Sequence, residues 1–260
     1  RGVLDSVLSL LREPGVTHLA AATDHVIRSW RNDRYPGYKT EVGMPADLLA
    51  QFADAERGLA ALGVVTWPMV EWEADDALAT AVARYADDPR VEQTVICSVD
   101  MDLAQCVRGS RVVLRDRMRN VTYDEAGVIA KFGVPPASIP DWLALVGDSA
   151  DGYPGLPGWG ARSAAAVLAR WGSLDRVPEG VGGWDLPVPL RNAPRLAATL
   201  RDLRDEALLY RELARLRTDV PIRETIEELE WQGAPSDEFH AFCAELGLDT
   251  PTRVHRWRDG

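Results

Sequence analysis

Residues 64–85, VVTWPMVEWEADDALATAVARY, place an apolar stretch, an acidic turn and an amphipathic segment in direct succession. Val64–Val70 has the length and composition of a buried strand, and Glu73–Tyr85 carries apolar residues at helical spacing. The acidic sequence E-A-D-D (73–76) lies at the start of this helix. A strand that leads into a helix is the repeating unit of α/β proteins with a mainly parallel sheet.

The same alternation extends in both directions from this stretch. Further strands are predicted at Thr17–Thr23, Thr94–Val99 and Arg111–Arg115. Helices are predicted at Leu4–Leu11, Pro45–Leu62, Asp124–Phe132, Pro140–Val146, Ala161–Trp171, Arg195–Arg217 and Pro235–Leu246. Strand patterns end near Pro136, so the chain changes from an α/β pattern to a helical one there.

This change predicts three parts. Residues 1–136 form an α/β core with a mainly parallel central sheet flanked by helices, residues 137–217 form a helical module, and residues 218–260 form a C-terminal segment that returns to the core. Pro178–Pro194 is rich in glycine and proline and is expected to be a loop, and residues 217–221 are expected to return as an extended segment to the sheet.

Composition limits the classes of function. The 260 residues carry a net charge of −11, which argues against a protein that coats nucleic acid by bulk charge but not against a nuclease with local basic patches. Three cysteines without CxxC spacing make a disulfide framework or a structural zinc site unlikely to be present. We find neither a signal peptide nor an apolar run of about 18 residues, so we expect a cytoplasmic location without a membrane partner.

Acidic residues concentrate where the predicted strands end. Asp24, the group Glu73, Asp75 and Asp76, and the pair Asp100 and Asp102 follow three strands, and Asp148 and Asp151 lie in a loop between helices. Ligands bind at the carboxyl edge of open parallel sheets. Each group has an alternative interpretation as helix caps or turn formers.

Clustered carboxylates repel one another and therefore favour a site for cations. An oxygen-rich site suits Mg²⁺ or Mn²⁺, and up to eight carboxylates exceed the needs of one ion. Two ions about 4 Å apart can hold the attacking and leaving oxygens of a phosphodiester. The four histidines show no ligand spacing and are interpreted as structural.

Two segments have features that bind phosphate. Residues 28–39 combine arginines and Lys39 with Trp30, Tyr35 and Tyr38, a mixture typical of single-strand binding, although a solvated surface helix would look similar. The sequence G-L-P-G-W-G (155–160) opens the predicted helix Ala161–Trp171, where backbone N–H groups can hold phosphate without reading sequence. The alternative is a tight connection between packed helices.

Taken together, these motifs resemble the 5′ nuclease (flap endonuclease) superfamily, and in particular the bacterial stand-alone 5′–3′ exonucleases related to the N-terminal domain of DNA polymerase I. The motifs are W-R-N-D-R-Y-P-G-Y-K (30–39), W-E-A-D-D (72–76), S-V-D-M-D (98–102), G-D-S-A-D-G-Y-P-G (147–155) and G-L-P-G-W-G (155–160). The resemblance runs from Arg1 to about Pro221.

The resemblance implies a PIN-like α/β nuclease core, a helix–three-turn–helix DNA-binding module and two-metal hydrolysis of DNA at 5′ flaps or 5′ ends during replication or repair. It assigns Asp24, Glu73, Asp75, Asp76 and Asp100 to a first Mg²⁺ or Mn²⁺ ion and Asp102, Asp148 and Asp151 to a second. Lys39 and Arg31 would contact the scissile phosphate, and Tyr38 would stack on a base. Gly158, Gly160, Arg162 and Ser163 would hold duplex phosphates, together with a K⁺ ion. We expect a monomer.

Some positions depart from the family pattern. Family members begin with a strand that carries an aspartate, and this chain starts after that point, so either the sequence is truncated or this segment is missing. Met101 stands where the family usually has lysine, and Gly152 stands where it often has asparagine. These departures favour the alternative of a catalytically degenerate branched-DNA-binding protein. A third possibility, a metal phosphohydrolase of small molecules, fits residues 28–39 and 155–160 poorly.

Overall fold

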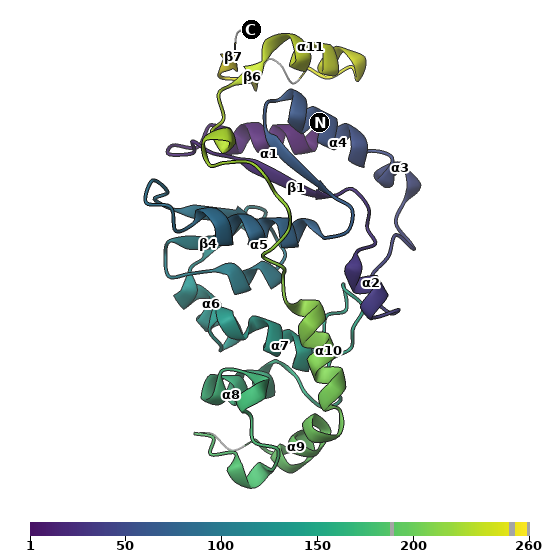
Figure 1. Ribbon diagram of the computed structural model, residues 1–260, viewed down its shortest axis with the longest axis vertical. Helices are drawn as coiled ribbons and strands as arrows, with labels where there is room; N and C mark the ends of the chain where they lie inside the picture. Colours follow the sequence, from purple (N-terminus) through teal and green to yellow (C-terminus); the bar gives the residue numbers. More distant parts are fainter. Residues whose placement is uncertain (188–189, 250–252, 259–260) are drawn as a thin grey trace. The chain divides into compact units, whose positions relative to one another are not determined.

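The computed structural model describes residues 1–187, 190–249 and 253–258, and its contacts divide the chain into two units (Figure 1). The first unit comprises residues 1–29, 40–77 and 220–260, and the second comprises residues 30–39 and 78–219. Each unit is therefore built from separate stretches of sequence. Helix α5 (Ala74–Tyr85) begins in the first unit and continues in the second.

The first unit contains a small parallel sheet covered by helices. Strand β1 (Ala20–Asp24) pairs with β2 (Val65–Met69), with Ala20 opposite Val65 and Asp24 opposite Met69. The helices are α1 (Gly2–Leu11), α3 (Ala46–Leu49), α4 (Phe52–Ala61) and α11 (Ser236–Glu245). Short strands β6 (Ala234–Pro235) and β7 (Trp257–Arg258) pair in parallel. The apolar faces of α1, α4 and α11 meet in one core, which includes Leu4, Leu8 and Phe239.

The second unit joins a three-stranded sheet to a set of helices. Strands β3 (Thr94–Cys97) and β4 (Val112–Asp116) are parallel, and β5 (Val121–Tyr123) adds antiparallel to β4. The helices after α5 are α6 (Glu125–Phe132), α7 (Ile139–Val146), α8 (Ala161–Trp171), α9 (Ala193–Asp202) and α10 (Arg204–Ala214). Residues 30–39 contribute α2 (Trp30–Arg34). Helix α7 packs against both α8 and α10.

Local sequence explains where these helices begin and end. Asp124 caps α6 by accepting a hydrogen bond from the Gly127 backbone at 2.7 Å, and Gly133 ends the helix with φ at 74°. Pro140 occupies the first turn of α7, where a missing N–H costs nothing. One apolar core runs from α5 through α7, α8 and α10, and it includes Leu145, Leu168 and Leu213.

The α/β fold class is confirmed, and most predicted elements are present within one to three residues at their ends. In place of a single mainly parallel sheet, the described residues form three small sheets: β1–β2, β3–β4–β5 and β6–β7. The single helix predicted at Pro45–Leu62 is wrong: α3 buries no side chain, so packing does not hold it in line with α4. The helix predicted at Arg195–Arg217 also divides, because Leu203 leaves helical geometry at φ −116° and ψ 38°.

Two further differences concern strands. Strand β5 was missed because it has only three residues, two of them exposed. Residues 217–221 form no strand among the described residues. The returning chain instead pairs further on, where Leu19 N donates to Leu229 O and Trp231 N donates to Thr17 O, both at 3.0 Å. The three-part division of the chain stays a prediction, and residues 188–189, 250–252 and 259–260 of its loop and tail lie outside the described residues.

Within the described ranges, every helix is too short or too polar to cross a bilayer.

Candidate functional site

Two segments of the second unit carry four of the predicted carboxylates. The first segment directly follows strand β3. There the Ser98 hydroxyl accepts a hydrogen bond from Asp100 N, and Asp100 Oδ1 accepts one from Asp102 N, both at 3.0 Å. Asp102 then begins the 3₁₀ turn Asp102–Cys106. These local bonds fix the turn so that Asp102 is buried while Asp100 stays exposed.

The second segment is a tight loop after helix α7. Asp148 Oδ1 accepts hydrogen bonds from Ala150 N at 2.7 Å and from Asp151 N at 3.1 Å. The backbones of Asp148 and Tyr153 exchange hydrogen bonds at 2.9 and 3.0 Å, which closes the loop. Gly152 has a φ of 90°, a value that L side chains rarely adopt. The sequence thus folds this loop around its own aspartate and glycine.

Residues 37–39 dock on this loop through Asp151. Lys39 Nζ lies 2.9 Å from Asp151 Oδ1, and the Tyr38 hydroxyl donates to Asp151 Oδ2 at 2.9 Å. The Lys39 backbone N–H also donates to Asp151 O at 3.0 Å. A Cβ atom at Gly152 would overlap the carbonyl oxygen of Gly37, so only glycine permits this approach. Both carboxylate oxygens of Asp151 are therefore engaged by residues 38 and 39.

The electrostatics show that these carboxylates are neighbours. Asp100 is exposed as a residue, but the surrounding atoms shield its carboxyl group from water, and this desolvation raises its pKa. The charges of Asp151 and Asp148 raise the pKa of Asp100 further. Lys39 acts in the opposite direction and lowers this pKa. Burial is also the main cause that raises the pKa of Tyr153, followed by the charges of Asp102, Asp151 and Asp148.

The donor chemistry of the second unit suits a divalent cation. Its carboxylate oxygens are the ligands that Mg²⁺ and Mn²⁺ prefer, and their mutual repulsion would fall when a cation binds. Within the described residues, however, no three His, Cys, Asp or Glu side chains are already arranged to hold a metal ion. Asp151 would have to exchange its bond to Lys39 for one to the metal. The residues therefore fit a metal by chemistry, and binding requires side chains to move.

The first unit carries the other four predicted ligands. Asp24 Oδ1 accepts a hydrogen bond from Ala74 N at 2.7 Å, and Asp76 Oδ2 accepts one from Glu73 N at 3.2 Å. Asp24 and Asp76 thus cap the start of α5. Helix capping was the alternative interpretation of Asp76, whereas the alternative for Asp24 was a turn at the end of its strand. Glu73 is 3% exposed and Asp76 is 0% exposed, and Asp75 is half-buried. Burying charge is costly, so capping alone is a weak reason to place a fully buried carboxylate there.

Ser29 is a site residue that the sequence analysis missed. Its hydroxyl donates to Glu73 Oε1 at 2.7 Å, and both side chains are buried. The hydrogen bond gives one oxygen of this buried carboxylate a partner. The only signal in the sequence was its position immediately before the aromatic and basic segment, and a lone serine there predicts nothing specific.

Arg31 is buried within the second unit. Only 1% of the residue is exposed, and its guanidinium donates to the carbonyl of Leu213 at 2.7 Å and to that of Arg215 at 3.5 Å. It also lies 4.7 Å from the centre of the Trp30 ring. A cation at the carboxyl end of α10 is favourable for the helix dipole. The predicted contact of Arg31 with the scissile phosphate stays a prediction.

The glycine-rich loop before α8 has the predicted open geometry. Gly158 and Arg162 are exposed, and Gly160 precedes the first turn. The Ser163 hydroxyl accepts from Gly160 N at 3.0 Å and donates to Gly160 O at 2.9 Å. A Cβ atom at Gly158 would meet only the side chain of Leu196, at 3.9 Å. The predicted contact of Gly158, Gly160, Arg162 and Ser163 with duplex phosphates stays a prediction.

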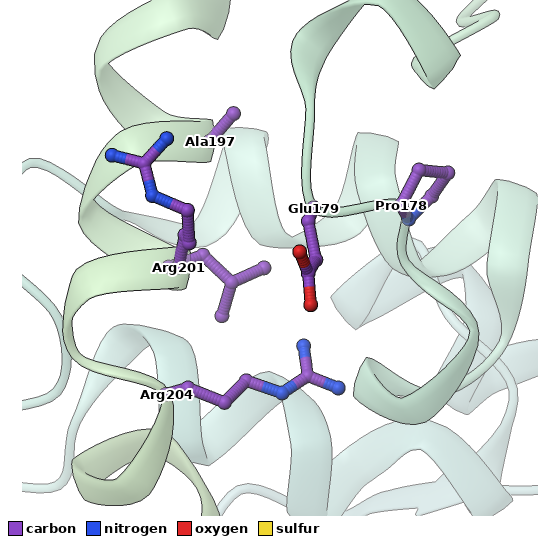
Figure 2. Close-up of a pocket in the computed structure, with 6 residues that line it drawn as sticks. Pro178, Glu179, Ala197, Arg201 and Arg204 are labelled. Atoms are coloured by element: carbon purple, nitrogen blue, oxygen red, sulfur yellow. The ribbon is translucent and has the colours of Figure 1, made fainter.

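Two depressions in the second unit lie outside the carboxylate segments. Figure 2 shows the smaller one, where Glu179 points toward Arg204 and Arg201 lines the opposite wall. Its volume is about 70 Å³, well below the roughly 300 Å³ at which small-molecule sites begin. The larger depression, about 580 Å³, runs along α10 beside Trp30. Neither contains a predicted metal ligand.

Comparisons with known proteins cover nearly the whole chain. The family model for "5′-3′ exonuclease, N-terminal resolvase-like domain" matches residues 1–133, and the model for "5′-3′ exonuclease, C-terminal SAM fold" matches residues 134–237. DNA polymerase I of Pseudomonas aeruginosa is 34% identical over 268 residues, which cover 100% of this chain and 28% of that protein. DNA polymerase I of Mycobacterium leprae is 33% identical and covers 94% of this chain and 26% of that protein.

Solved structures share the fold at lower identity. A T5 5′-exonuclease with bound divalent metal ions (zinc) has a TM-score of 0.67 and 16% identity, covering 94% of this chain and 89% of that one. The catalytic core of Rad2 in complex with DNA substrate has a TM-score of 0.61 and 17% identity, covering 95% and 78%. The chain spans about a quarter of the length of the curated relatives that it matches.

Proposed function

Because this chain belongs to the 5′–3′ exonuclease family, we propose that it is a structure-specific 5′ nuclease that hydrolyses DNA phosphodiesters with two divalent metal ions. The two family models together match residues 1–237, which supports a chain carrying both the resolvase-like and the helical domain. The family resemblance inferred from the motifs is thereby confirmed. The substrate, the metal and the residue roles are part of the proposal.

One observation carries the proposal: the second unit holds four neighbouring carboxylates together with a lysine. Asp100, Asp148 and Asp151 influence one another electrostatically, and Lys39 forms an ion pair with Asp151. A carboxylate set with a cationic side chain is suited to binding Mg²⁺ beside a phosphate. A purely structural loop would not need several aspartates that repel one another.

The side chains have separate roles in this proposal. By the family resemblance, Asp102, Asp148 and Asp151 would hold one Mg²⁺ ion, and the other would be assigned to Asp24, Glu73, Asp75, Asp76 and Asp100. When bound, the metal ions supply activation of water and stabilisation of charge on the phosphate. Lys39 leaves Asp151 and turns its ammonium group to the scissile phosphate, with Arg31 as a second cation, while Tyr38 is freed to stack on a base.

Duplex DNA is held by a different part of the second unit. Gly158, Gly160, Arg162 and Ser163 contact its phosphates, and a K⁺ ion on backbone carbonyls of the same loop completes the contact. These contacts carry no sequence information, which suits an enzyme that recognises a 5′ flap or a 5′ end by shape. We also propose that the protein acts as a cytoplasmic monomer.

The test is cleavage of a 5′-labelled flap DNA in Mg²⁺, with binding to the same DNA measured in Ca²⁺. D102N and D148N are expected to lose Mg²⁺-dependent cleavage and to keep DNA binding. D185N is the matched control, because its side chain is 94% exposed and distant in sequence from the carboxylate segments. Cleavage at the wild-type rate by D102N or D148N would show that the site assignment is wrong.

The second candidate is a branched-DNA-binding protein without catalysis. Met101, where the family usually has lysine, favours it. It predicts that the wild-type chain binds flap DNA and never cleaves it at any Mg²⁺ concentration. The same assay separates the two candidates, because D102N then behaves as the wild type does in both measurements.

A further inference from the structure

The Tyr153 hydroxyl is a buried donor without an acceptor. Tyr153 is 1% exposed, and its oxygen has no hydrogen-bond partner among the described residues. Leaving a buried hydroxyl unpaired is unfavourable, and native proteins rarely do so without a reason. Three other buried polar atoms in the described chain share this condition, namely Asp5 Oδ1, Trp142 Nε1 and Trp159 Nε1.

Tyr153 differs from these three by its position. Its backbone exchanges two hydrogen bonds with Asp148, and it follows Asp151 by two residues. Its ring stacks on that of Tyr210 at a centroid distance of 5.6 Å and an interplanar angle of 22°. The stacking on Tyr210 and the backbone bonds to Asp148 hold the ring in place. The charges of Asp102, Asp151 and Asp148 raise the pKa of this hydroxyl in addition to burial, and the charge of Arg31 lowers it.

We propose that Tyr153 is a positioning residue for the metal site: its hydroxyl donates a hydrogen bond to one of the carboxylates of this site, Asp102, Asp148 or Asp151, once a divalent cation has bound. This inference rests on the proposed metal-dependent function. Binding requires the carboxylates to change their present hydrogen bonds, as the Lys39–Asp151 pair shows. Because the Tyr153 hydroxyl is unpaired before this change and paired after it, the new hydrogen bond stabilises the metal-bound arrangement. Hydrogen bonds to ligating carboxylates orient them and strengthen metal binding.

The experiment compares Y153F with Y210F, each of which keeps its ring and loses only a hydroxyl. Mg²⁺ affinity is measured by calorimetry, and thermal unfolding is measured in EDTA. We expect Y153F to weaken Mg²⁺ binding by roughly 10–100-fold and to raise the melting temperature of the metal-free protein. The rise follows because phenylalanine removes an unpaired buried polar atom. Y210F is expected to bind Mg²⁺ as the wild type does.

Two results would overturn this proposal. One is unchanged Mg²⁺ affinity in Y153F, and the other is a lower metal-free melting temperature, which a purely structural hydroxyl predicts. If the wild type binds no Mg²⁺, this proposal and the nuclease proposal both fail. If the wild type does not cleave flap DNA while Y153F still weakens Mg²⁺ binding, only the nuclease proposal fails.

Discussion

Replacing Gly152 with alanine should detach residues 37–39 from the carboxylate loop. Gly152 has a φ of 90°, and its missing side chain leaves room for the carbonyl of Gly37. Gly172 is the matched control because its φ of 75° is also positive, while a Cβ there meets nothing within 4 Å. Both alanines therefore suffer the backbone penalty, and only G152A suffers the collision.

The magnitudes follow from what each substitution disturbs. A left-handed conformation costs an alanine about 1–2 kcal/mol, which is the expected loss in G172A. In G152A the chain at residues 37–39 must also move, which removes the hydrogen bond from Lys39 N to Asp151 O, worth about 1 kcal/mol. The buried hydrogen bond from the Tyr38 hydroxyl to Asp151 is also lost and is worth about 1 kcal/mol. The partly exposed Lys39–Asp151 ion pair adds about 1 kcal/mol after allowance for solvent screening. We expect a total loss of about 4–5 kcal/mol.

Urea denaturation in EDTA, followed by tryptophan fluorescence, measures the difference between the two variants. Limited trypsin digestion provides a second readout, since Arg34 and Lys39 become cleavable when the segment detaches in G152A and stay protected in G172A. Equal losses of stability, together with equal protection from trypsin, would refute the argument that Gly152 exists to admit Gly37.

Further predictions concern other contacts of the second unit. R211A should cost about 3–5 kcal/mol of unfolding free energy at pH 7, because it leaves the buried Asp141 carboxylate without its cation. Burial already raises the pKa of Asp141 and Arg211 opposes that rise, so in R211A the folded state binds a proton more readily than the unfolded state. Its stability should therefore recover as the pH falls through the raised pKa of Asp141 toward the ordinary value of 3.8, as measured by urea titrations at several pH values. R201A, which removes an exposed pair with Asp202, should change stability by less than about 0.5 kcal/mol at any pH, and a pH-independent loss in R211A would contradict the argument. R162A should weaken binding to duplex DNA equally for unrelated sequences and reduce the salt slope of log Kd by about one, whereas a sequence-dependent loss would exclude a phosphate contact.

Much of the fold could be predicted because it depends on local patterns. The alternation that begins at Val64–Val70 and Glu73–Tyr85 identified the α/β class, and the acidic residues after these strands supplied the prediction of a metal site. The local hydrogen bonds of Asp100 and Asp148 are of the kind that short sequences encode. Element ends and the two divided helices were less predictable, since packing decided them.

The arrangement of the site could not be predicted, because it depends on contacts between distant residues. Tyr38 and Asp151 are 113 residues apart, and the sequence contains no sign that they would share a hydrogen bond. Arg31 was interpreted from its charge alone, and its contact with Leu213 spans 182 residues. The unpaired hydroxyl of Tyr153 likewise becomes visible only when its neighbours are placed.

These long separations have a consequence for how the protein is made. Residues 30–39 leave the ribosome before the hydrogen-bond partners described above, from Asp151 to Arg215, are synthesised. At roughly 5–20 residues per second, Tyr38 waits on the order of ten seconds for Asp151. During that interval its aromatic and basic neighbours are exposed on a nascent chain. A chain of such high contact order should fold slowly, and the final seating of this segment should be a late step.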